Sequence, residues 1–302
     1  MKATVVVTSY NYEKFAVECV RSIADQTYQN MEIIFVDDGS SDNTNVLIND
    51  LKLDKLRILE KTNGGQLSAF NAALPHITGD LVFFIDADDM YEPSYLEKSV
   101  DFYRNNGDAD FLFAGINYFG NTNKSSDVGI NQSHGFSVCK TWFLRCWIGA
   151  PTSAISMRKS VLDKILPLEL ESDWKVRADD CLIWGASLVG AKKYFFGDAA
   201  IRYRVHGNNN FFGKQFNADD SFKRALGINR MFNLVAQKNH ITITPDLLIW
   251  EFDAHPEKNT GVLLDYLKMT LMLNASIFKK VITALRIARR YFKRSKAFSV
   301  NA

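Results

Sequence analysis

The stretch Leu81-Val82-Phe83-Phe84-Ile85-Asp86-Ala87-Asp88-Asp89 joins a continuous apolar run to a cluster of carboxylates. The apolar part predicts a strand that is buried on both faces, because β-branched and aromatic residues fill it without a polar break. The carboxylates then stand at the carboxyl end of that strand, where they can chelate a hard divalent cation. An isolated D-x-D is also an ordinary solvated turn, so the neighbouring strand ends must decide between the two interpretations.

The first half of the chain alternates short apolar runs with helical patterns. Strands are predicted at 5–7, 33–36, 56–59 and 81–85, and helices at 13–26, 44–51 and 66–74. This alternation predicts an α/β fold with right-handed crossovers and a mostly parallel sheet. Ligands are expected where the carboxyl ends of such strands meet their loops.

Polar residues follow each of the four predicted strands, in the order Tyr10-Asn11, Asp37-Asp38-Gly39-Ser40, Asn63-Gly64-Gly65 and Asp86-Ala87-Asp88-Asp89. A carboxylate at Asp38 can accept a hydrogen bond from a ring N–H such as that of uracil, while Gly39 permits a tight turn. Alternatively, Ser40, Ser41 or Asp42 can cap the next helix. Both interpretations can hold at different residues.

Four motifs occur in order within the first hundred residues: Thr8-Ser9-Tyr10-Asn11, Val36-Asp37-Asp38-Gly39-Ser40-Ser41-Asp42, Asn63-Gly64-Gly65 with Ala69 and Asn71, and Asp86-Ala87-Asp88-Asp89. In this order and spacing they resemble the family 2 glycosyltransferases with the GT-A fold. The resemblance implies a mostly parallel central sheet flanked by helices. It also implies inverting transfer of one sugar from a nucleotide-diphosphate donor, typically a UDP-sugar, with Mn²⁺ or Mg²⁺ as cofactor.

The resemblance also implies roles for individual residues in donor binding. These are Thr8 and Tyr10 beside the base, Asp38 on the uracil edge, Gly65 in the donor loop, Asp86 at the ribose or metal shell, and Asp88 as a metal ligand. One position departs from the family pattern. Many members carry Arg before the Asn that corresponds to Asn71, whereas this chain has Phe70, so no donor contact by such an Arg is implied.

An acidic pair in the second half, Arg177-Ala178-Asp179-Asp180, resembles the pair that the family places at the start of a helix below the acceptor. Asp180 is then the implied general base, with Asp179 near the acceptor. The chemistry requires a carboxylate that takes the proton of the acceptor hydroxyl as it attacks the anomeric carbon. A single in-line displacement inverts that carbon. The alternative is that either carboxylate only caps the helix.

Further elements of the resemblance concern phosphate and acceptor binding. In Tyr203-Arg204-Val205-His206, the cation of Arg204 can offset phosphate charge, and the imidazole of His206 can complete a metal shell. The following stretch through residue 212 is a candidate for a loop that closes over the donor. Trp142 and Trp147 are candidates for stacking on an acceptor sugar. For His206 and both Trp residues, the alternative is a structural role in the core.

Composition shifts suggest how the chain is organised. Residues 117–137, rich in Gly, Asn, Ser and Lys, predict an irregular surface segment. Strands are predicted at 152–157 and 193–205, a helix at 180–189, and mainly helices after 219. We therefore expect a GT-A domain at 1–215, with a donor half at 1–105 and an acceptor half at 106–215, and a helical extension at 216–302.

The end of the extension is basic and amphipathic. No acidic residue follows Asp265, and the cations there are Lys268, Lys279, Lys280, Arg286, Arg289, Arg290, Lys293, Arg294 and Lys296. Apolar residues recur between them at three- and four-residue spacing. Such a helix at 278–296 can lie on an anionic membrane. The alternative is packing against the catalytic domain or against a second subunit in a homo-oligomer.

Composition limits the classes of partner and compartment. The chain has 36 basic and 34 acidic residues, a balance that does not favour nucleic acid as a partner. Four cysteines without zinc-type spacing, no secretory leader and no membrane-length apolar run favour the cytoplasm, with peripheral membrane contact. The expected acceptor is a carbohydrate or a lipid-linked oligosaccharide. The main alternative is a non-catalytic nucleotide-sugar-binding or scaffold protein on the same fold.

Overall fold

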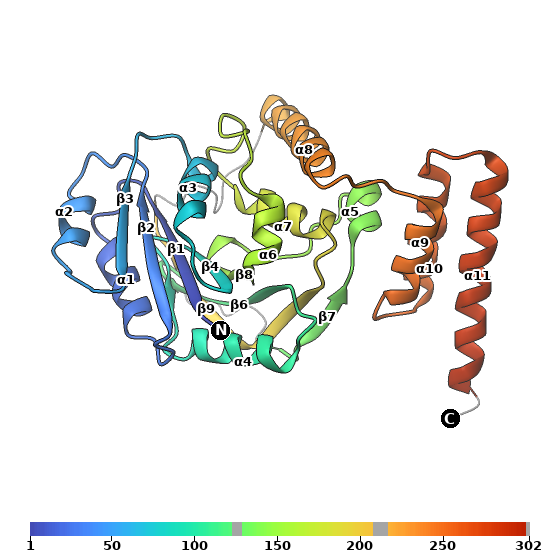
Figure 1. The fold of residues 1–302 in the computed structure, drawn as a ribbon, viewed down its shortest axis with the longest axis horizontal. Coiled ribbons are helices and arrows are strands. Elements are labelled where there is room, and N and C mark those ends of the chain that lie inside the picture. The colour runs from blue at the N-terminus through green and yellow to red at the C-terminus, as the bar shows by residue number, and fades with distance from the viewer. Residues whose placement is uncertain (123–128, 208–216, 300–302) are drawn as a thin grey trace.

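The computed structural model describes residues 1–122, 129–207 and 217–299, with side chains omitted at 198–199 and 294–299. A central sheet has the strand order β3-β2-β1-β4-β8-β6-β9-β5, and β7 pairs with β9 (Figure 1). Its strands are β1 (Ala3–Ser9), β2 (Met31–Asp37), β3 (Leu56–Glu60), β4 (Leu81–Asp86), β5 (Met90–Tyr91), β6 (Phe111–Gly120), β7 (Gln132–Gly135), β8 (Ile155–Arg158) and β9 (Lys193–Val205).

The pairing confirms the predicted α/β fold with a mostly parallel sheet. Parallel neighbours are β1 with β2 and β4, β2 with β3, and β6 with β9, while β8 runs antiparallel between β4 and β6. The register places Thr8 opposite Asp86 and Ser9 opposite Asp37. The polar groups that end these strands therefore lie along one edge of the sheet.

Helices cover the sheet and supply the residues between strands. They are α1 (Ala16–Ala24), α2 (Thr44–Asn49), α3 (Gln66–Ala73), α4 (Tyr95–Asn105), α5 (Val138–Leu144), α6 (Lys159–Ile165) and α7 (Asp179–Leu188). The helix predicted from residue 13 begins at Ala16, because the carbonyl of Tyr12 closes a turn by accepting the N–H groups of Phe15 and Ala16. The strand predicted at 152–157 was wrong for Thr152–Ala154, which form a 3-10 turn.

The irregular segment predicted at 117–137 contains regular structure. Strand β6 continues to Gly120 in register with β9, and β7 pairs antiparallel with the start of β9. The prediction was therefore wrong for the strand residues. Long-range pairing with β9 satisfies their backbone groups, and local composition does not reveal such a partner. Residues 123–128 lie outside the described part of the chain.

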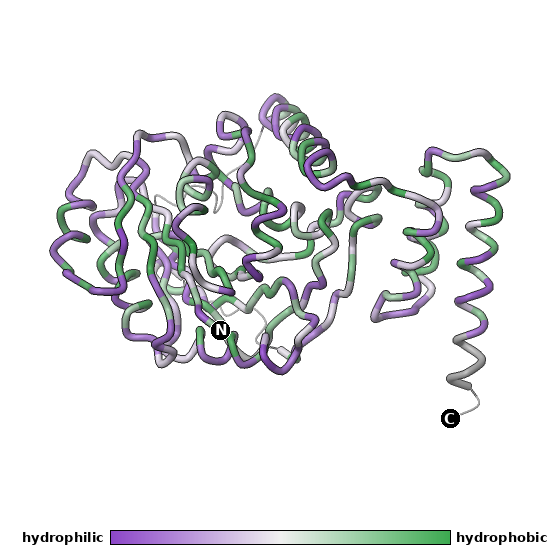
Figure 2. Tube along the Cα trace, in the orientation of Figure 1, coloured by the Kyte–Doolittle hydropathy of each residue, from purple (hydrophilic) through white to green (hydrophobic). Residues whose placement is uncertain are grey.

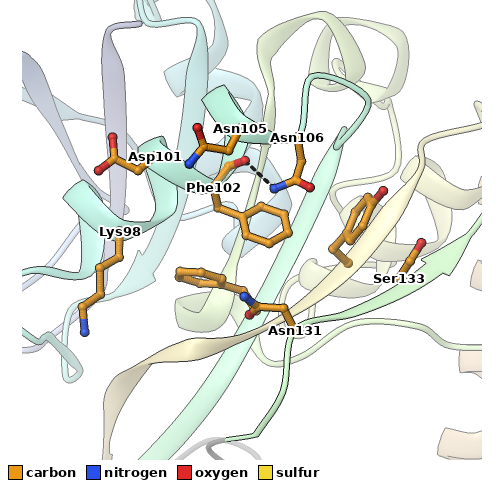
Figure 3. A pocket seen from close by; sticks show the side chains of 9 residues that line it. Lys98, Asp101, Phe102, Asn105, Asn106, Asn131 and Ser133 are labelled. Carbon is orange, nitrogen blue, oxygen red and sulfur yellow. Dashed lines mark hydrogen bonds between the residues drawn. The ribbon is translucent and has the colours of Figure 1, made fainter.

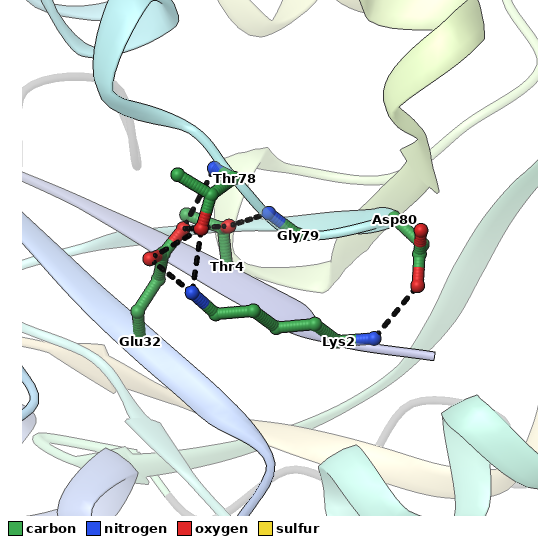
Figure 4. A network of polar contacts seen from close by, with 6 residues as sticks. All are labelled: Lys2, Thr4, Glu32, Thr78, Gly79 and Asp80. Carbon is green, nitrogen blue, oxygen red and sulfur yellow. Dashed lines mark hydrogen bonds and ion pairs between the residues drawn. The ribbon is translucent and has the colours of Figure 1, made fainter.

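A polar network fastens the opposite, amino-terminal edge of the sheet (Figure 4). The carboxylate of Glu32 accepts hydrogen bonds from Lys2 Nζ at 2.6 Å, Thr4 Oγ1 at 2.6 Å and the Thr78 amide at 2.8 Å. Burial alone would raise the pKa of Glu32, but these hydrogen bonds lower it to about 2. The network links β1, β2 and the turn before β4, and it leaves the carboxyl edge open for ligands.

The C-terminal part is helical, as predicted. Helix α8 (Ala218–Lys238) adds Met231, Phe232 and Val235 to the main core, whereas α9 (Pro245–Ala254), α10 (Thr260–Met272) and α11 (Ile277–Ser299) surround a second apolar cluster. These three helices stand beside the sheet domain, and polar and apolar residues alternate along α11 (Figures 1 and 2). The predicted boundary at 215 falls outside the described residues. None of the described helices is long and apolar enough to cross a membrane.

Candidate active site

A cleft of about 510 Å³ opens along the carboxyl edge of the sheet. Its walls come from the ends of β1 and β4, the loops after β2 and β3, the segment 147–152 and the segment before α7. Predicted site residues that line it are Thr8, Tyr10, Asp38, Gly65, Asp86, Asp88, Trp147 and Asp179. Residues more than 170 positions apart in the chain are thus brought into one cavity.

Asp86 lies at the floor of this cleft. Its Oδ1 accepts hydrogen bonds from Thr8 Oγ1 at 3.1 Å and from Gln66 Nε2 at 2.9 Å. Burial raises the pKa of Asp86 to about 7, and the charges of Asp88 and Asp179 act in the same direction. The site therefore concentrates negative charge that a cation can relieve.

Asp88 and His206 are brought together from distant parts of the chain. His206 Nε2 lies 3.0 Å from Asp88 Oδ2. A carboxylate and an imidazole at this spacing fit a divalent cation, since Mg²⁺ and Mn²⁺ sites often take one or two protein ligands together with substrate phosphates. No cluster of three such protein ligands occurs within the described ranges.

Asp89 and Arg204 join the acidic motif to β9. The carboxylate of Asp89 accepts the backbone N–H of Arg204 at 2.7 Å, and Arg204 Nε donates to the carbonyl of Asp88 at 2.8 Å. The guanidinium also pairs with Glu18 and lies over the ring of Phe15. Arg204 therefore contacts the acidic motif but does not line the cleft.

The carboxylate of Asp38 organises the loop after β3. It accepts the N–H groups of Gly64 at 3.0 Å and Gly65 at 2.7 Å, and it pairs with Lys61 Nζ at 2.6 Å. Nearby, Asp42 accepts the N–H of Thr44 at the start of α2. Asp42 therefore contacts the start of α2, whereas Asp38 lines the cleft.

The two carboxylates of the acidic pair at the start of α7 are both buried, but only one of them lines the cleft. Asp179 lines the cleft, whereas Asp180 is fully buried and accepts hydrogen bonds from Trp147 Nε1 at 2.8 Å and Arg177 at 3.3 Å. Arg224 of α8 pairs with its second oxygen. Burial and the charge of Asp180 raise the pKa of Asp179, and burial raises that of Asp180 against the opposing charges of both Arg residues.

The two candidate acceptor Trp residues occupy different environments. Trp147 is 39% exposed on the cleft wall, whereas Trp142 packs against Phe232 in the core, with ring centroids 6.1 Å apart. Trp142 therefore does not reach the cleft. Of the predicted closing loop, residues 208–212 lie outside the described part of the chain.

Several cleft residues were not predicted from the sequence, chiefly Tyr12, Gln66, Lys175 and Arg177. Tyr12 follows the first strand in the loop that also carries Tyr10, so its position there was a usable signal. Gln66 and Arg177 stand next to predicted motifs, but nothing in their own spacing indicates the direction of their side chains. Arg224 lies on a distant helix and is connected to Asp180 only by the tertiary fold.

A second cavity of about 790 Å³ lies between α4 and β9 (Figure 3). Two of its amides are used within the fold, because Asn106 donates to the carbonyl of Phe102 and Asn131 accepts the N–H of Gly197. Its one carboxylate, Asp101, pairs with Arg104. Although it is larger, this cavity lacks converging charged groups, so the cleft at the strand ends is the better candidate for catalysis.

Comparison with known proteins agrees with this geometry. The model of glycosyl transferase family 2 matches residues 4–166, which is more than half of the chain, so the chain belongs to this family. An uncharacterised glycosyltransferase of Nostoc sp. is 32% identical over 219 residues, covering 70% of this chain and 66% of the relative. Another, from Haemophilus influenzae, is 30% identical over 68% of this chain and 66% of its own length. The chain thus spans about two thirds of the length of these relatives.

Solved structures confirm the GT-A type of fold. Residues 1–349 of Staphylococcus aureus TarS, solved in complex with UDP-GlcNAc, superpose with a TM-score of 0.58 at 18% identity, covering 98% of this chain and 92% of that one. A mannosyltransferase from Pyrobaculum calidifontis, solved with GDP-Man and Mn²⁺, gives 0.53 at 17% identity over 99% and 83%. At such low identity the likeness concerns the fold alone.

Proposed function

We propose that this chain transfers a single sugar, with inversion, from a UDP-sugar to a carbohydrate or lipid-linked oligosaccharide acceptor. The observation that carries the proposal is one cleft that is lined by Asp38, Asp86, Asp88 and Asp179. Family membership supports a transferase, and the UDP-GlcNAc bound by TarS supports the nucleotide class. A nucleotide-sugar-binding protein without turnover has less support, because binding the donor does not require a further carboxylate such as Asp179 in the cleft.

In the proposed reaction, Tyr10 and Thr8 border the base, and Asp38 holds the glycine loop against the nucleotide side of the cleft. Asp88 and His206 would hold Mn²⁺ or Mg²⁺, and the cation would offset the negative charge of the diphosphate leaving group. The acceptor hydroxyl approaches from the side of Trp147 and Asp179 and attacks the anomeric carbon opposite the diphosphate. A single displacement of this kind gives inversion.

We assign proton removal from the acceptor to the acidic pair of α7. Asp180 is the base that the family resemblance implies, but both of its oxygens are engaged by Trp147, Arg177 and Arg224. Asp179 faces the cleft, and burial and the charge of Asp180 raise its pKa towards the range that suits a general base. The geometry therefore favours Asp179 as the carboxylate that contacts the acceptor. Asp180 would then stabilise the start of α7 through its contacts with Trp147, Arg177 and Arg224.

The proposal can be tested by thermal unfolding with a panel of UDP-, GDP- and TDP-sugars, each with and without Mn²⁺. We expect one UDP-sugar to raise the Tm by several degrees only when Mn²⁺ is present, because a ligand that binds only the folded state stabilises it. Uniform absence of a shift across the panel would contradict a nucleotide-sugar site. If only GDP-sugars raised the Tm, the proposed sugar transfer would stand, but the assignment of UDP as the donor nucleotide would be wrong.

We also propose that α11 holds the enzyme on the cytoplasmic face of an anionic membrane. Ile287 and Thr283 of α11 are buried against the neighbouring helices, whereas Phe278 (71% exposed), Leu285 (64%) and Phe292 (58%) face solvent. Lys279 and Lys293 follow Phe278 and Phe292 directly in sequence, and Arg289 lies one helical turn after Leu285. Apolar side chains flanked by cations fit a surface of anionic headgroups over acyl chains better than they fit water.

Sedimentation with phosphatidylserine–phosphatidylcholine vesicles tests the membrane proposal. Phe278→Ser combined with Leu285→Ser should weaken vesicle binding by at least about tenfold, since each buried apolar side chain contributes roughly 1.5–3 kcal/mol. Val46→Ser, which removes an exposed apolar side chain from α2, is the matched control and should leave binding unchanged. Binding that survives the double substitution contradicts the proposal. A dimer that the same substitution dissociates would instead identify a second copy as the partner.

A further inference from the structure

The segment Gly65 to Leu67, at the start of α3, forms a seam with the segment that precedes α7. The backbone N–H of Gln66 donates to the carbonyl of Lys175 at 2.9 Å, and that of Leu67 donates to Trp174 at 3.2 Å. Gly65 has a φ of +87°, and a Cβ there would lie 2.3 Å from the Cα of Lys175. This close approach brings the donor half and the acceptor half into direct contact beside the cleft.

The side chain of Gln66 crosses this seam and bonds to three separate elements. Its Nε2 donates to Asp86 Oδ1 at 2.9 Å and to Thr152 Oγ1 at 3.1 Å, while its Oε1 accepts the N–H of Ala178 at 2.8 Å. The amide orientation follows from chemistry, because a backbone N–H can only donate and therefore faces the oxygen. The amide of Gln66 thus connects Asp86 with Ala178, the residue immediately before Asp179.

We propose that Gln66 is a positioning residue that holds Asp86 and the start of α7 in one register, so that the bound donor and the acidic pair face each other correctly. The inference rests on the proposed function and adds to it a residue that sets the alignment of the two walls. Its physical basis is that transfer depends steeply on alignment, and a misplacement of about 1 Å can lower the rate by roughly a hundredfold.

Asn71, five residues further along α3, offers a matched control. Its amide makes the same kind of cross-link to the acceptor half, donating to the carbonyl of Leu168 at 2.9 Å and accepting the N–H of Leu168 at 3.1 Å. Its amide also donates to Glu171 Oε1 at 2.6 Å, and Asn71 is not among the residues that line the cleft. Loss of Asn71 therefore loosens the joint between the halves without touching the reacting groups.

The experiment compares Gln66→Leu with Asn71→Leu in the full chain. Three quantities are measured: the Tm, the affinity for UDP with Mn²⁺ by calorimetry, and the release of UDP from the UDP-sugar that stabilises the wild type. Gln66→Leu should lower turnover by about tenfold to a hundredfold and UDP affinity by several-fold. Asn71→Leu should lower the Tm by about as much as Gln66→Leu does. It should keep UDP affinity and turnover within about twofold of the wild type, because its contacts are only structural.

Gln66→Glu separates the two arms of the amide. A carboxylate at this position still accepts the N–H of Ala178, but it places a second negative charge against Asp86 in place of a donor. We therefore expect weaker UDP binding than in the wild type, with the Tm closer to the wild-type value than in Gln66→Leu.

Two results would overturn the positioning role. One is Gln66→Leu with wild-type affinity and turnover; the other is Asn71→Leu with an equal loss of turnover at an equal loss of Tm, which would reduce Gln66 to a structural link. A wild-type chain that neither binds UDP nor releases it from a sugar nucleotide is a different outcome. It overturns the proposed function first, and the positioning role of Gln66 with it.

Discussion

Replacing Asp88 with Asn is expected to remove the Mn²⁺-dependent part of UDP binding and to lower turnover of the UDP-sugar by at least about a hundredfold. Asn keeps the size of the side chain and loses its charge, so the packing around Asp88 should survive. The reason for the loss is that Asp88 lines the cleft and lies 3.0 Å from His206, as the carboxylate of the proposed two-residue cation site.

Calorimetry with UDP, with and without Mn²⁺, measures the effect on binding. Asp101→Asn is the matched control, because Asp101 is an exposed carboxylate of the second cavity and pairs only with Arg104 among the described ion pairs. Its affinity and turnover should equal those of the wild type. If Asp88→Asn kept its Mn²⁺ response, the assignment of Asp88 as a metal ligand would be wrong.

The second large effect is expected from the acidic pair of α7. Asp179→Asn should lower turnover by about a hundredfold to ten-thousandfold and keep UDP affinity near the wild-type value, because proton removal from the acceptor is lost while the donor wall is intact. Asp180→Asn should differ from Asp179→Asn by also lowering the Tm. It removes the buried negative charge that pairs with both Arg177 and Arg224.

The pH dependence of turnover distinguishes which carboxylate is the base. A base must be ionised, so turnover should rise with pH through the raised pKa of Asp179. Removing the negative charge of Asp180 lowers that pKa, so the rise should move to lower pH in Asp180→Asn. If Asp180 itself is the base, as the family resemblance implies, Asp180→Asn loses turnover at every pH and Asp179→Asn keeps most of it.

Sequence patterns predicted the parts of the site that depend on strand ends. The runs at 33–36 and 81–85 end in Asp37-Asp38 and in the acidic cluster, and parallel pairing to β1 necessarily brings such ends to one edge. The segment 117–137 was misjudged for the opposite reason. Its strand residues include Asn117, Gly120 and Gly135, which have a low intrinsic preference for strands, and their stability comes from pairing with β9, which lies much later in the chain.

The amino-acid sequence by itself determined the fold class, the edge of the sheet where the cleft opens and the presence of Asp86, Asp88 and the acidic pair of α7. These follow from local periodicity, because strand and helix patterns fix which end of each element carries the polar group. Only the tertiary structure decided that Asp179 faces the cleft while Asp180 is closed off by Arg224, and that Gln66 bridges the two walls. Side-chain direction at such positions depends on which distant charges and backbone groups pack against it, and no local pattern encodes those neighbours.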